Sequence, residues 1–313
     1  MSTRSVFAAA AVLATAGLAA GQVNGVYKPA YGAPVTFQGI GTGFGNSTNG
    51  QVQNANGSEL NAAFAYESGG LLNLLLTGNL ENNFNKLVLF FDNGDLGGYN
   101  VLPNPSVASM PDKYNGMTLD QNGVNGATAT FRATHWLSVT CGGGPFGMYV
   151  DGGNLLTNTG GYLGGNDGQS GGLLSGGSNV LNAAVALDNS NVAGVDGTAG
   201  TAQGLNALTA LTGLEVQIPL ASLGIGTING LRVMAFINGS NHDYLSNQFL
   251  GSLPVGSGNL GGDGAGGFNG SVGGINLNAS YAAGDQFFTL VPAPGSIALL
   301  AIGGLAAARR RRA

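Results

Sequence analysis

The chain is poor in the side chains that most catalytic and metal sites require. Its 313 residues include one cysteine, one tryptophan and two histidines, and only 8% are charged. A single cysteine cannot form an internal disulfide, and no His-x-x-His or Cys-x-x-Cys pair of the kind that binds zinc occurs. The lysines and arginines are too sparse for a nucleic-acid-binding surface, which requires clustered positive charge. We therefore expect no disulfide framework, no zinc site and no nucleic-acid partner.

Glycine and uncharged polar residues are abundant instead. The chain contains 58 glycines, yet 43% of its residues are hydrophobic. Disordered chains are poor in apolar residues, so this composition favours a folded protein with glycine-rich turns. The lone Cys141 follows an apolar run, and we expect it to be a small buried residue at a strand end. The alternative is a free thiol for an intermolecular bond or a nucleophile.

The first 21 residues have the pattern of a secretory signal peptide. Arg4 is the only charged residue before Lys28, an apolar run extends from Val6 to Ala20, and small residues follow at Ala19, Ala20 and Gly21. A charged start, an apolar middle and a small-residue exit are typical of signal peptides. We expect cleavage after Gly21 and export through the Sec translocon. A retained N-terminal anchor is the alternative.

The last 23 residues, 291–313, form a second distinct segment. A helix of the 14 uncharged residues 295–308 would be about 21 Å long, which is shorter than a hydrocarbon core of about 30 Å. Reading the run back to Phe287 makes it long enough to span. Basic residues beside a span hold that end in the cytoplasm. The segment begins with Val291 and a proline pair and ends with an arginine cluster: Pro292, Pro294, Arg309, Arg310, Arg311 and Arg312.

This order of parts resembles the PEP-CTERM sorting signal of bacterial proteins that are recognised by exosortase-type membrane proteases. One position differs, because Ala293 stands where the motif has Glu. The resemblance implies transient insertion in the inner membrane, cleavage near the prolines and delivery to the cell envelope or the extracellular matrix. A retained transmembrane anchor is the alternative. An amphipathic surface helix is disfavoured, because the run is apolar on all sides.

The segment between these two, residues 22–290, consists of short apolar runs separated by Gly, Asn and Ser. Alternation of apolar and polar residues, and runs apolar on both faces, predict strands. Many short strands predict an all-β sandwich, of jelly-roll-like type, with long Gly/Asn-rich loops at 99–125, 152–178 and 253–283. Long helical periodicity is absent apart from a weak patch at 203–211, and we expect one helical turn at 219–223. The predicted strands are 60–67, 71–78, 86–92, 135–141, 147–151, 180–188, 213–219, 231–238 and 286–290.

Three of these runs resemble a known group. The three runs are LVLFFDNGD, GLEVQIPLASLG and LRVMAFINGS. Their order along the chain is similar to that in the carbohydrate-binding sandwiches of the family 9 and DOMON-like type. The resemblance covers residues 59–240 and implies a β-sandwich with a sugar site. The chain departs from those proteins in having few binding-site aromatics. The body also resembles uncharacterised secreted proteins that carry the same kind of tail.

Aromatic side chains are the candidates for a sugar platform, since exposed rings stack on pyranose faces. They are Trp136, Tyr149, Tyr162, Tyr244 and Phe249, although most aromatics of a β protein pack in its core. The best polar cluster is His242, Asp243 and Tyr244, which follows a predicted strand where loops carry function. Together with Trp136, these three residues are the candidate ligand site.

Catalytic and metal sites are less well supported. Ser138 or Ser246 with His242 and Asp243 could form a triad, but adjacent residues of a strand point to opposite faces. We therefore expect no enzyme, with a glycoside-acting hydrolase as the third alternative. Asx-rich loops could bind calcium through oxygen atoms, although Asp, Asn and Gly are also ordinary turn formers. The candidate calcium ligands are Asp92, Asp95, Asp188 and Asp196.

Two glycine-rich segments complete the list of motifs. GGDGAGG at 261–267 resembles one copy of a calcium-binding nonapeptide repeat, but that fold needs stacked copies. GIGTGFG at 39–45 has neither a preceding strand nor a following helix, so we interpret it as a flexible loop rather than a nucleotide site. The sequence as a whole predicts an exported structural or adhesive protein, with exopolysaccharide as a candidate partner. A carbohydrate-binding module is the alternative.

Overall fold

The computed structural model describes residues 23–45, 50–121, 130–169, 171–195 and 198–291. The predicted signal peptide and the tail beyond Val291 lie outside these residues. Within the described part, no helix is long and apolar enough to cross a membrane.

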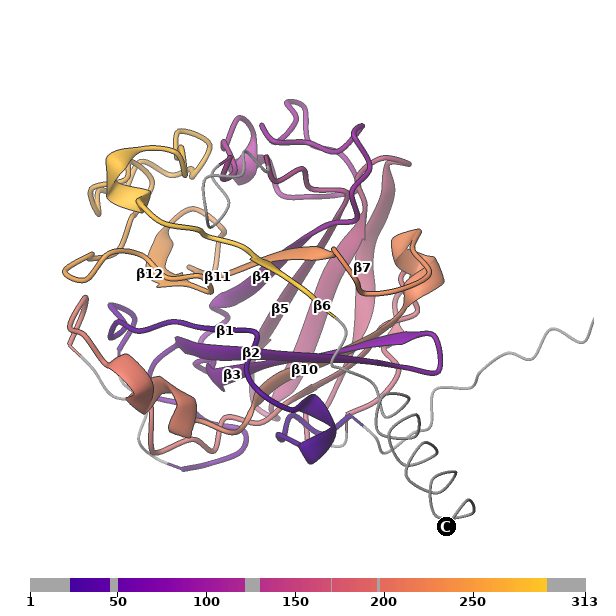
Figure 1. Ribbon diagram of the computed structural model, residues 1–313, viewed down its shortest axis with the longest axis horizontal. Helices are drawn as coiled ribbons and strands as arrows, with labels where there is room; N and C mark the ends of the chain where they lie inside the picture. Colours follow the sequence, from indigo (N-terminus) through magenta and orange to yellow (C-terminus); the bar gives the residue numbers. More distant parts are fainter. Residues whose placement is uncertain (1–22, 46–49, 122–129, 170, 196–197, 292–313) are drawn as a thin grey trace, which may run out of the picture.

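The described chain is built from two antiparallel β-sheets and a few short 3-10 turns, which confirms the prediction of an all-β fold. The smaller sheet has the strand order β1-β2-β3-β10-β9, and its centre is the long hairpin of β2 and β3 (Figure 1). Its strands are β1 (Thr36–Phe37), β2 (Glu59–Ser68), β3 (Leu71–Asn79), β10 (Gly213–Pro219) and β9 (Ala184–Leu187). The 3-10 turns are η1 (Pro29–Tyr31), η2 (Asp112–Tyr114), η3 (Gly204–Thr209), η4 (Leu220–Leu223) and η5 (Ser280–Ala282).

The larger sheet has the order β12-β11-β4-β5-β6-β7-β8, and β13 pairs with β11. Strands β4 to β8 follow one another in the chain and in the sheet, so this part is a simple meander, whereas β11 returns from the smaller sheet to pair with β4. Its strands are β4 (Lys86–Asp92), β5 (His135–Gly142), β6 (Gly147–Asn154), β7 (Thr159–Asn166), β8 (Ser175–Gly176), β11 (Arg232–Asn238), β12 (Leu245–Phe249) and β13 (Phe288–Thr289).

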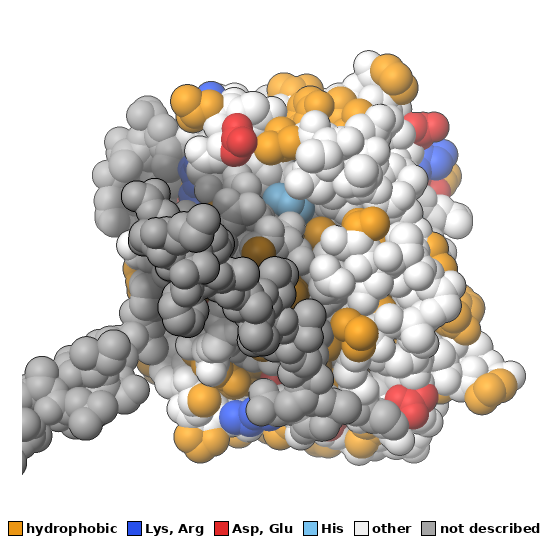
Figure 2. Space-filling model, turned by 90° about the vertical axis from the view of Figure 1, so that its right-hand side faces the viewer, with side chains coloured by type: hydrophobic (Ala, Val, Ile, Leu, Met, Phe, Trp, Pro, Cys, Tyr) orange, Lys and Arg blue, Asp and Glu red, His pale blue; other side chains and the backbone are white. Residues whose placement is uncertain are grey.

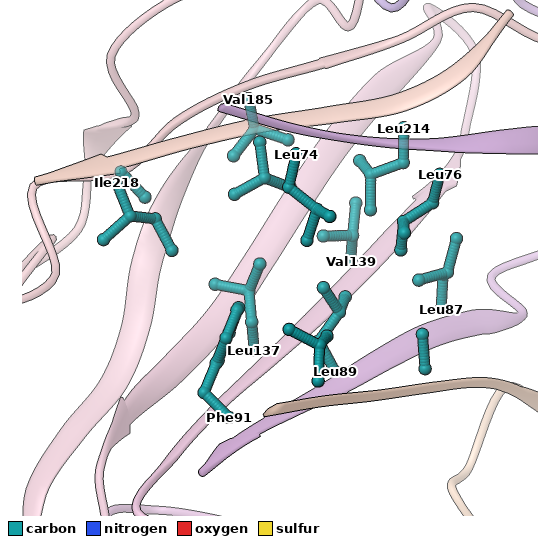
Figure 3. Packing of buried hydrophobic residues seen from close by; sticks show 14 of the residues in the cluster. Leu74, Leu76, Leu87, Leu89, Phe91, Leu137, Val139, Val185, Leu214 and Ile218 are labelled. Atoms are coloured by element: carbon teal, nitrogen blue, oxygen red, sulfur yellow. The ribbon is translucent and has the colours of Figure 1, made fainter. Parts of the chain in front are cut away.

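The two sheets share one apolar core. Side chains alternate across a strand, and in β4 the inward residues Leu87, Leu89 and Phe91 are buried against Leu74, Leu76 and other residues of the smaller sheet (Figure 3). The predicted common face of β11 is confirmed, since its alternate residues from Leu231 to Ile237 all lie in this core. Truncating such a buried leucine to alanine typically costs about 2–5 kcal/mol.

The outer face of the larger sheet is partly covered by two of the long segments predicted to be loops. They lie on the far side of this sheet from β2 and β3 (Figure 1). The sheet residues Phe90, Trp136 and Phe236 form a second buried cluster with Tyr114 and Leu119 of the first segment. Leu253, Leu260, Val272 and Ile275 of the second segment belong to the same cluster. These segments therefore act as a third layer over the strands β4, β5 and β11.

The segment 152–178 was predicted to be a loop, and this prediction is wrong. It contains the end of β6, all of β7 and β8. The sequence of β7, TGGYLGGN, offers no hydrophobic alternation, and it becomes a strand because it pairs along β6. The predicted strand 180–188 is shorter in the structure, since Asn179 and Asn182 adopt left-handed φ of 33° and 50° and form a turn before β9.

The outer face of the smaller sheet is held to the N-terminal segment by one carboxylate. Glu215 of β10 is buried, and its oxygens accept hydrogen bonds from the backbone N–H groups of Asn24 (2.7 Å) and Gly25 (3.0 Å). The carboxylate also accepts hydrogen bonds from Lys28 Nζ (2.7 Å) and Tyr31 Oη (2.8 Å). Burial and the Glu215 charge both raise the pKa of Tyr31, so its hydroxyl keeps its proton and donates.

Candidate functional site

Two of the predicted platform aromatics are core residues, and the prediction that they contact ligand is wrong. Trp136 is 1% exposed, and its indole N–H donates to the Ala108 carbonyl at 3.0 Å. Phe249 is fully buried and stacks on Phe236 with ring centroids 5.1 Å apart. Both point outward from the larger sheet, but the covering segments enclose them. Sequence alone could not reveal this cover.

The polar cluster His242, Asp243 and Tyr244 lies in the turn between β11 and β12, just past a strand end as predicted. His242 has a left-handed φ of 61°, is buried, and its Nδ1 is 2.8 Å from the Tyr114 hydroxyl. Tyr244 is half-buried, donates from its hydroxyl to the Gly266 carbonyl at 3.0 Å and stacks on Phe44. His242 and Tyr244 therefore hold this turn to the covering segments.

His242 is a neutral member of the hydrogen-bond network that it forms with Tyr114 and Asn238. Burial lowers the pKa of His242 to about 3, with a smaller contribution from the Lys86 charge, so the ring is neutral near pH 7. Asn238 Nδ2 donates to the Tyr114 hydroxyl at 3.0 Å. When the neutral ring carries its proton on Nε2, the Tyr114 hydroxyl donates to His242 Nδ1.

The serines proposed for a triad are not joined to His242 in the described contacts. The Ser246 hydroxyl donates to the Ile237 carbonyl at 2.8 Å and accepts from the Gln248 N–H at 3.0 Å. Ser138 lies on β5, on the outer face opposite Asp151 of β6. His242 is committed to Tyr114 instead. Among the residues that the structure describes, no nucleophile–base pair forms around this histidine.

Asp92, a candidate calcium ligand, has both carboxylate oxygens engaged by protein donors. Arg232 Nη2 lies 2.6 Å from Oδ2, which also accepts from the Arg132 N–H at 2.7 Å. Oδ1 accepts from the Gly94 N–H at 2.9 Å. A guanidinium at this distance occupies the position that a cation would take. Asp92 thus joins β4, β11 and the segment before β5.

The other calcium candidates form turn hydrogen bonds. Asp95 Oδ1 accepts from the Gly97 N–H at 2.8 Å, and Asp188 Oδ1 accepts from the Ser190 N–H at 2.8 Å. In GGDGAGG, Asp263 Oδ1 accepts from two backbone N–H groups, which lowers the pKa of this carboxyl. Among the described residues, no three His, Cys, Asp or Glu side chains gather as a metal site would require. Asp196 lies outside those residues.

Two further predictions concern Cys141 and the segment 39–45. Cys141 is buried at the end of β5, as expected, and burial raises the pKa of its thiol to about 12. The segment 39–45 is irregular and is fixed to distant parts of the chain, since the Gly41 N–H donates to the Thr201 carbonyl (2.8 Å) and the Gly43 N–H to Asn247 Oδ1 (2.9 Å).

Tyr149 and Tyr162 are the two platform candidates that the structure exposes on one face. They lie on β6 and β7, and their side chains are 40% and 43% exposed. Their neighbours Met148, Val150 and Leu163 belong to the core, so both tyrosines point outward from the larger sheet. The outer face of the larger sheet is therefore open to solvent at both tyrosines.

Charged and hydroxyl side chains accompany the tyrosines on this face. The register across the strands places Lys86 opposite Thr140 and Thr140 opposite Tyr149, while Asp151 is opposite Tyr162. The pKa of Lys86 is lowered, mainly by burial, and the nearby Asp151 charge offsets part of this effect. The pKa of Asp151 is raised, again mainly by burial, and the Lys86 charge offsets part of that effect. The face therefore combines two rings, hydroxyl groups and one charge of each sign.

A small hollow lies elsewhere, beneath the GGDGAGG turn. Its volume is about 190 Å³, and it is lined by Tyr281, Asn259 and Ser257 among others. Typical ligand pockets enclose roughly 300–1,000 Å³, so this hollow is small for a ligand site. Figure 2 shows another side of the surface, on which charged side chains are few and scattered among uncharged polar atoms and small apolar groups.

A comparison of the chain with protein-family models, with curated proteins and with solved structures finds no match. The site must therefore be interpreted from its own chemistry. The tyrosines could be identified from the sequence as aromatics, but which aromatics stay exposed depends on the covering segments, and no sequence signal marks those.

Proposed function

We propose that the chain is an exported structural or adhesive protein of the cell envelope or extracellular matrix. The order of the parts in the tail sequence carries this proposal: Val291, a proline pair, an apolar run and the terminal arginine cluster. The N-terminal run after Arg4 supports the same topology, because it would place the body outside and the arginines inside. The proposed partners are the Sec translocon and an exosortase-type membrane protease.

The proposed architecture of the body is a β-sandwich that resembles the carbohydrate-binding family 9 and DOMON-like proteins. The two antiparallel sheets with a shared apolar core support it. The jelly-roll-like variant is less well supported, because β4 to β8 form a meander rather than alternating between sheets. Calcium binding through Asp95, Asp188 or Asp196 stays a prediction.

A carbohydrate-binding module is the second candidate function. The outward pair Tyr149 and Tyr162 favours it, because exposed rings on adjacent strands offer flat apolar area beside hydroxyl groups. An adhesive role and a glycan-binding role are compatible, since a matrix protein can attach to exopolysaccharide through such a face.

The intact mass of the exported protein tests the sorting proposal. We expect the mature chain to lack residues 1–21 and the arginine cluster, because both signals are cut during export. A control in which all four arginines are replaced by glutamine should keep its tail, since the topological signal is gone. An Ala293→Glu variant, which restores the motif, should be processed at least as completely. A mature wild-type protein that retains its arginines would contradict processing.

A further inference from the structure

Three exposed aromatic rings lie on glycine positions of the larger sheet. The first is Phe84, 43% exposed, in the segment before β4. A Cβ at Gly142 of β5 would lie 2.7 Å from Cζ of this ring. Only a glycine allows the ring to lie so close to the strand. The Phe84 ring therefore rests on the surface of the sheet.

Tyr149 and Tyr162 lie on glycines in the same way. A Cβ at Gly147 would lie 2.7 Å from the Tyr149 hydroxyl, and a Cβ at Gly165 would lie 3.6 Å from Cδ1 of Tyr149. The same Cβ at Gly165 would lie 2.9 Å from the Tyr162 hydroxyl. Both side chains thus extend over neighbouring backbone rather than standing away from it.

The strand register places the three rings in one row. Gly142 is paired with Gly147 across β5 and β6, and Tyr149 is paired with Gly165 across β6 and β7. Neighbouring strands are about 4.8 Å apart, which is close to the length of one sugar unit in an extended chain. We name Phe84, Tyr149 and Tyr162 the aromatic strip. The strip crosses several strands of the larger sheet.

The backbone at Phe84 supports a role for its exposed ring. Its φ is 68°, in the left-handed region that bulky residues rarely adopt, and its N–H donates to the Cys141 carbonyl at 3.0 Å. The left-handed region is disfavoured for a non-glycine residue, so Phe84 carries a conformational cost. Burial does not offset that cost, because the ring stays exposed. Strained residues of this kind concentrate at functional sites.

We propose that the aromatic strip is a binding site for a linear, uncharged polysaccharide. The C–H groups of pyranose faces pack on the exposed ring faces, and the row suits consecutive units of one chain. The nearby charges are of opposite sign, Lys86 on β4 and Asp151 on β6, so the face favours hydroxyl groups over a net charge. This inference rests on the proposed adhesive function and names its ligand class.

Retention of the purified full chain on insoluble polysaccharides tests the site. Microcrystalline cellulose and insoluble mannan are the neutral probes, and calcium-gelled alginate is the acidic one. The double variant Tyr149→Ala/Tyr162→Ala should lose at least about tenfold in affinity for the neutral probe that retains wild type, because two stacking faces are removed. Tyr149→Phe should bind like wild type, since the ring remains. Phe268→Ala is the matched control, because Phe268 is an exposed aromatic outside the strip.

The outcomes separate this inference from the proposed function. Equal retention of wild type and double variant on a neutral probe would overturn the strip as the site but leave glycan adhesion standing. Retention on alginate alone, or on no probe, would overturn the proposed ligand class. Export and surface location are tested separately, by the mass of the exported protein. A change in oligomeric state of the double variant would overturn the inference in favour of self-association. Unaltered urea midpoints show that the variants are folded.

Discussion

Lowering the pH from about 7.5 to about 5 should reduce the free energy of unfolding by about 4 kcal/mol, because two buried histidines are neutral in the folded protein. Burial lowers the pKa of His135 to about 4 and that of His242 to about 3. In the unfolded chain both titrate near 6.5. Each histidine therefore contributes about 2 kcal/mol of this loss.

The sign follows from proton uptake. Below about pH 6.5 the two histidines of the unfolded chain bind protons, whereas those of the folded protein bind them only near pH 4 and pH 3. The stability contribution of the histidines is therefore fully present above about pH 6.5 and falls as the pH is lowered through this window. Asp151 and Glu81 oppose part of the loss, because burial raises the pKa of both carboxyls. The measurement is the urea midpoint at both pH values.

His242→Asn is the matched variant for this experiment. Asparagine tolerates the left-handed φ of 61° at this position, and it does not titrate. Its loss of stability between about pH 7.5 and about pH 5 should be about half that of wild type, about 2 kcal/mol, since only His135 remains. Equal losses in wild type and variant, or no loss in wild type, would contradict the assignment of buried neutral histidines.

Replacing Asp92 by alanine should destabilise the protein by about 3 kcal/mol. Removing one partner of a buried ion pair typically costs about 3–5 kcal/mol, and the lower end applies because the Arg232 side chain is 18% exposed and can reach water. The N–H groups of Gly94 and Arg132 also lose their acceptors. Denaturant unfolding at neutral pH measures the effect.

Asp95→Ala is the control in the same turn. Asp95 is exposed and its side chain accepts one hydrogen bond, from the Gly97 N–H, so loss of this carboxylate should cost about 1 kcal/mol or less. A chelator arm separates the ion pair from a calcium role at Asp92. If Asp92 acts through Arg232, wild type and Asp92→Ala keep their difference of about 3 kcal/mol when EDTA is added. A difference that disappears with EDTA would show that Asp92 holds a metal.

The strands that the sequence predicted well are those whose apolar pattern is strong. KLVLFFD became β4 with apolar residues on both faces, because this strand lies between the shared core and the covering segments. GLEVQIP and the short turn after it became β10 and η4, as predicted. Such runs carry their own burial signal, and no distant contact is needed to recognise them.

The elements that the sequence missed depend on distant partners. In β12, LSNQF, the polar residues Ser246, Asn247 and Gln248 are all buried and hydrogen-bonded, so a polar strand lies in the interior. The candidate site also depends on residues that are distant in the sequence. Trp136 was a prominent candidate because it is the single tryptophan, but residues far along the chain bury it. No sequence signal marks Phe84, because the glycine that accommodates its ring, Gly142, is on another strand.

Antibody labelling of intact cells tests the central claim, export of the folded body to the cell surface or matrix, most directly. Cells that express the chain are incubated with antibodies raised against the folded body, before and after lysis. The account predicts labelling of intact, unlysed cells or their surrounding matrix, and loss of that label after treatment of the cells with an external protease. Label that appears only after lysis would contradict the claim.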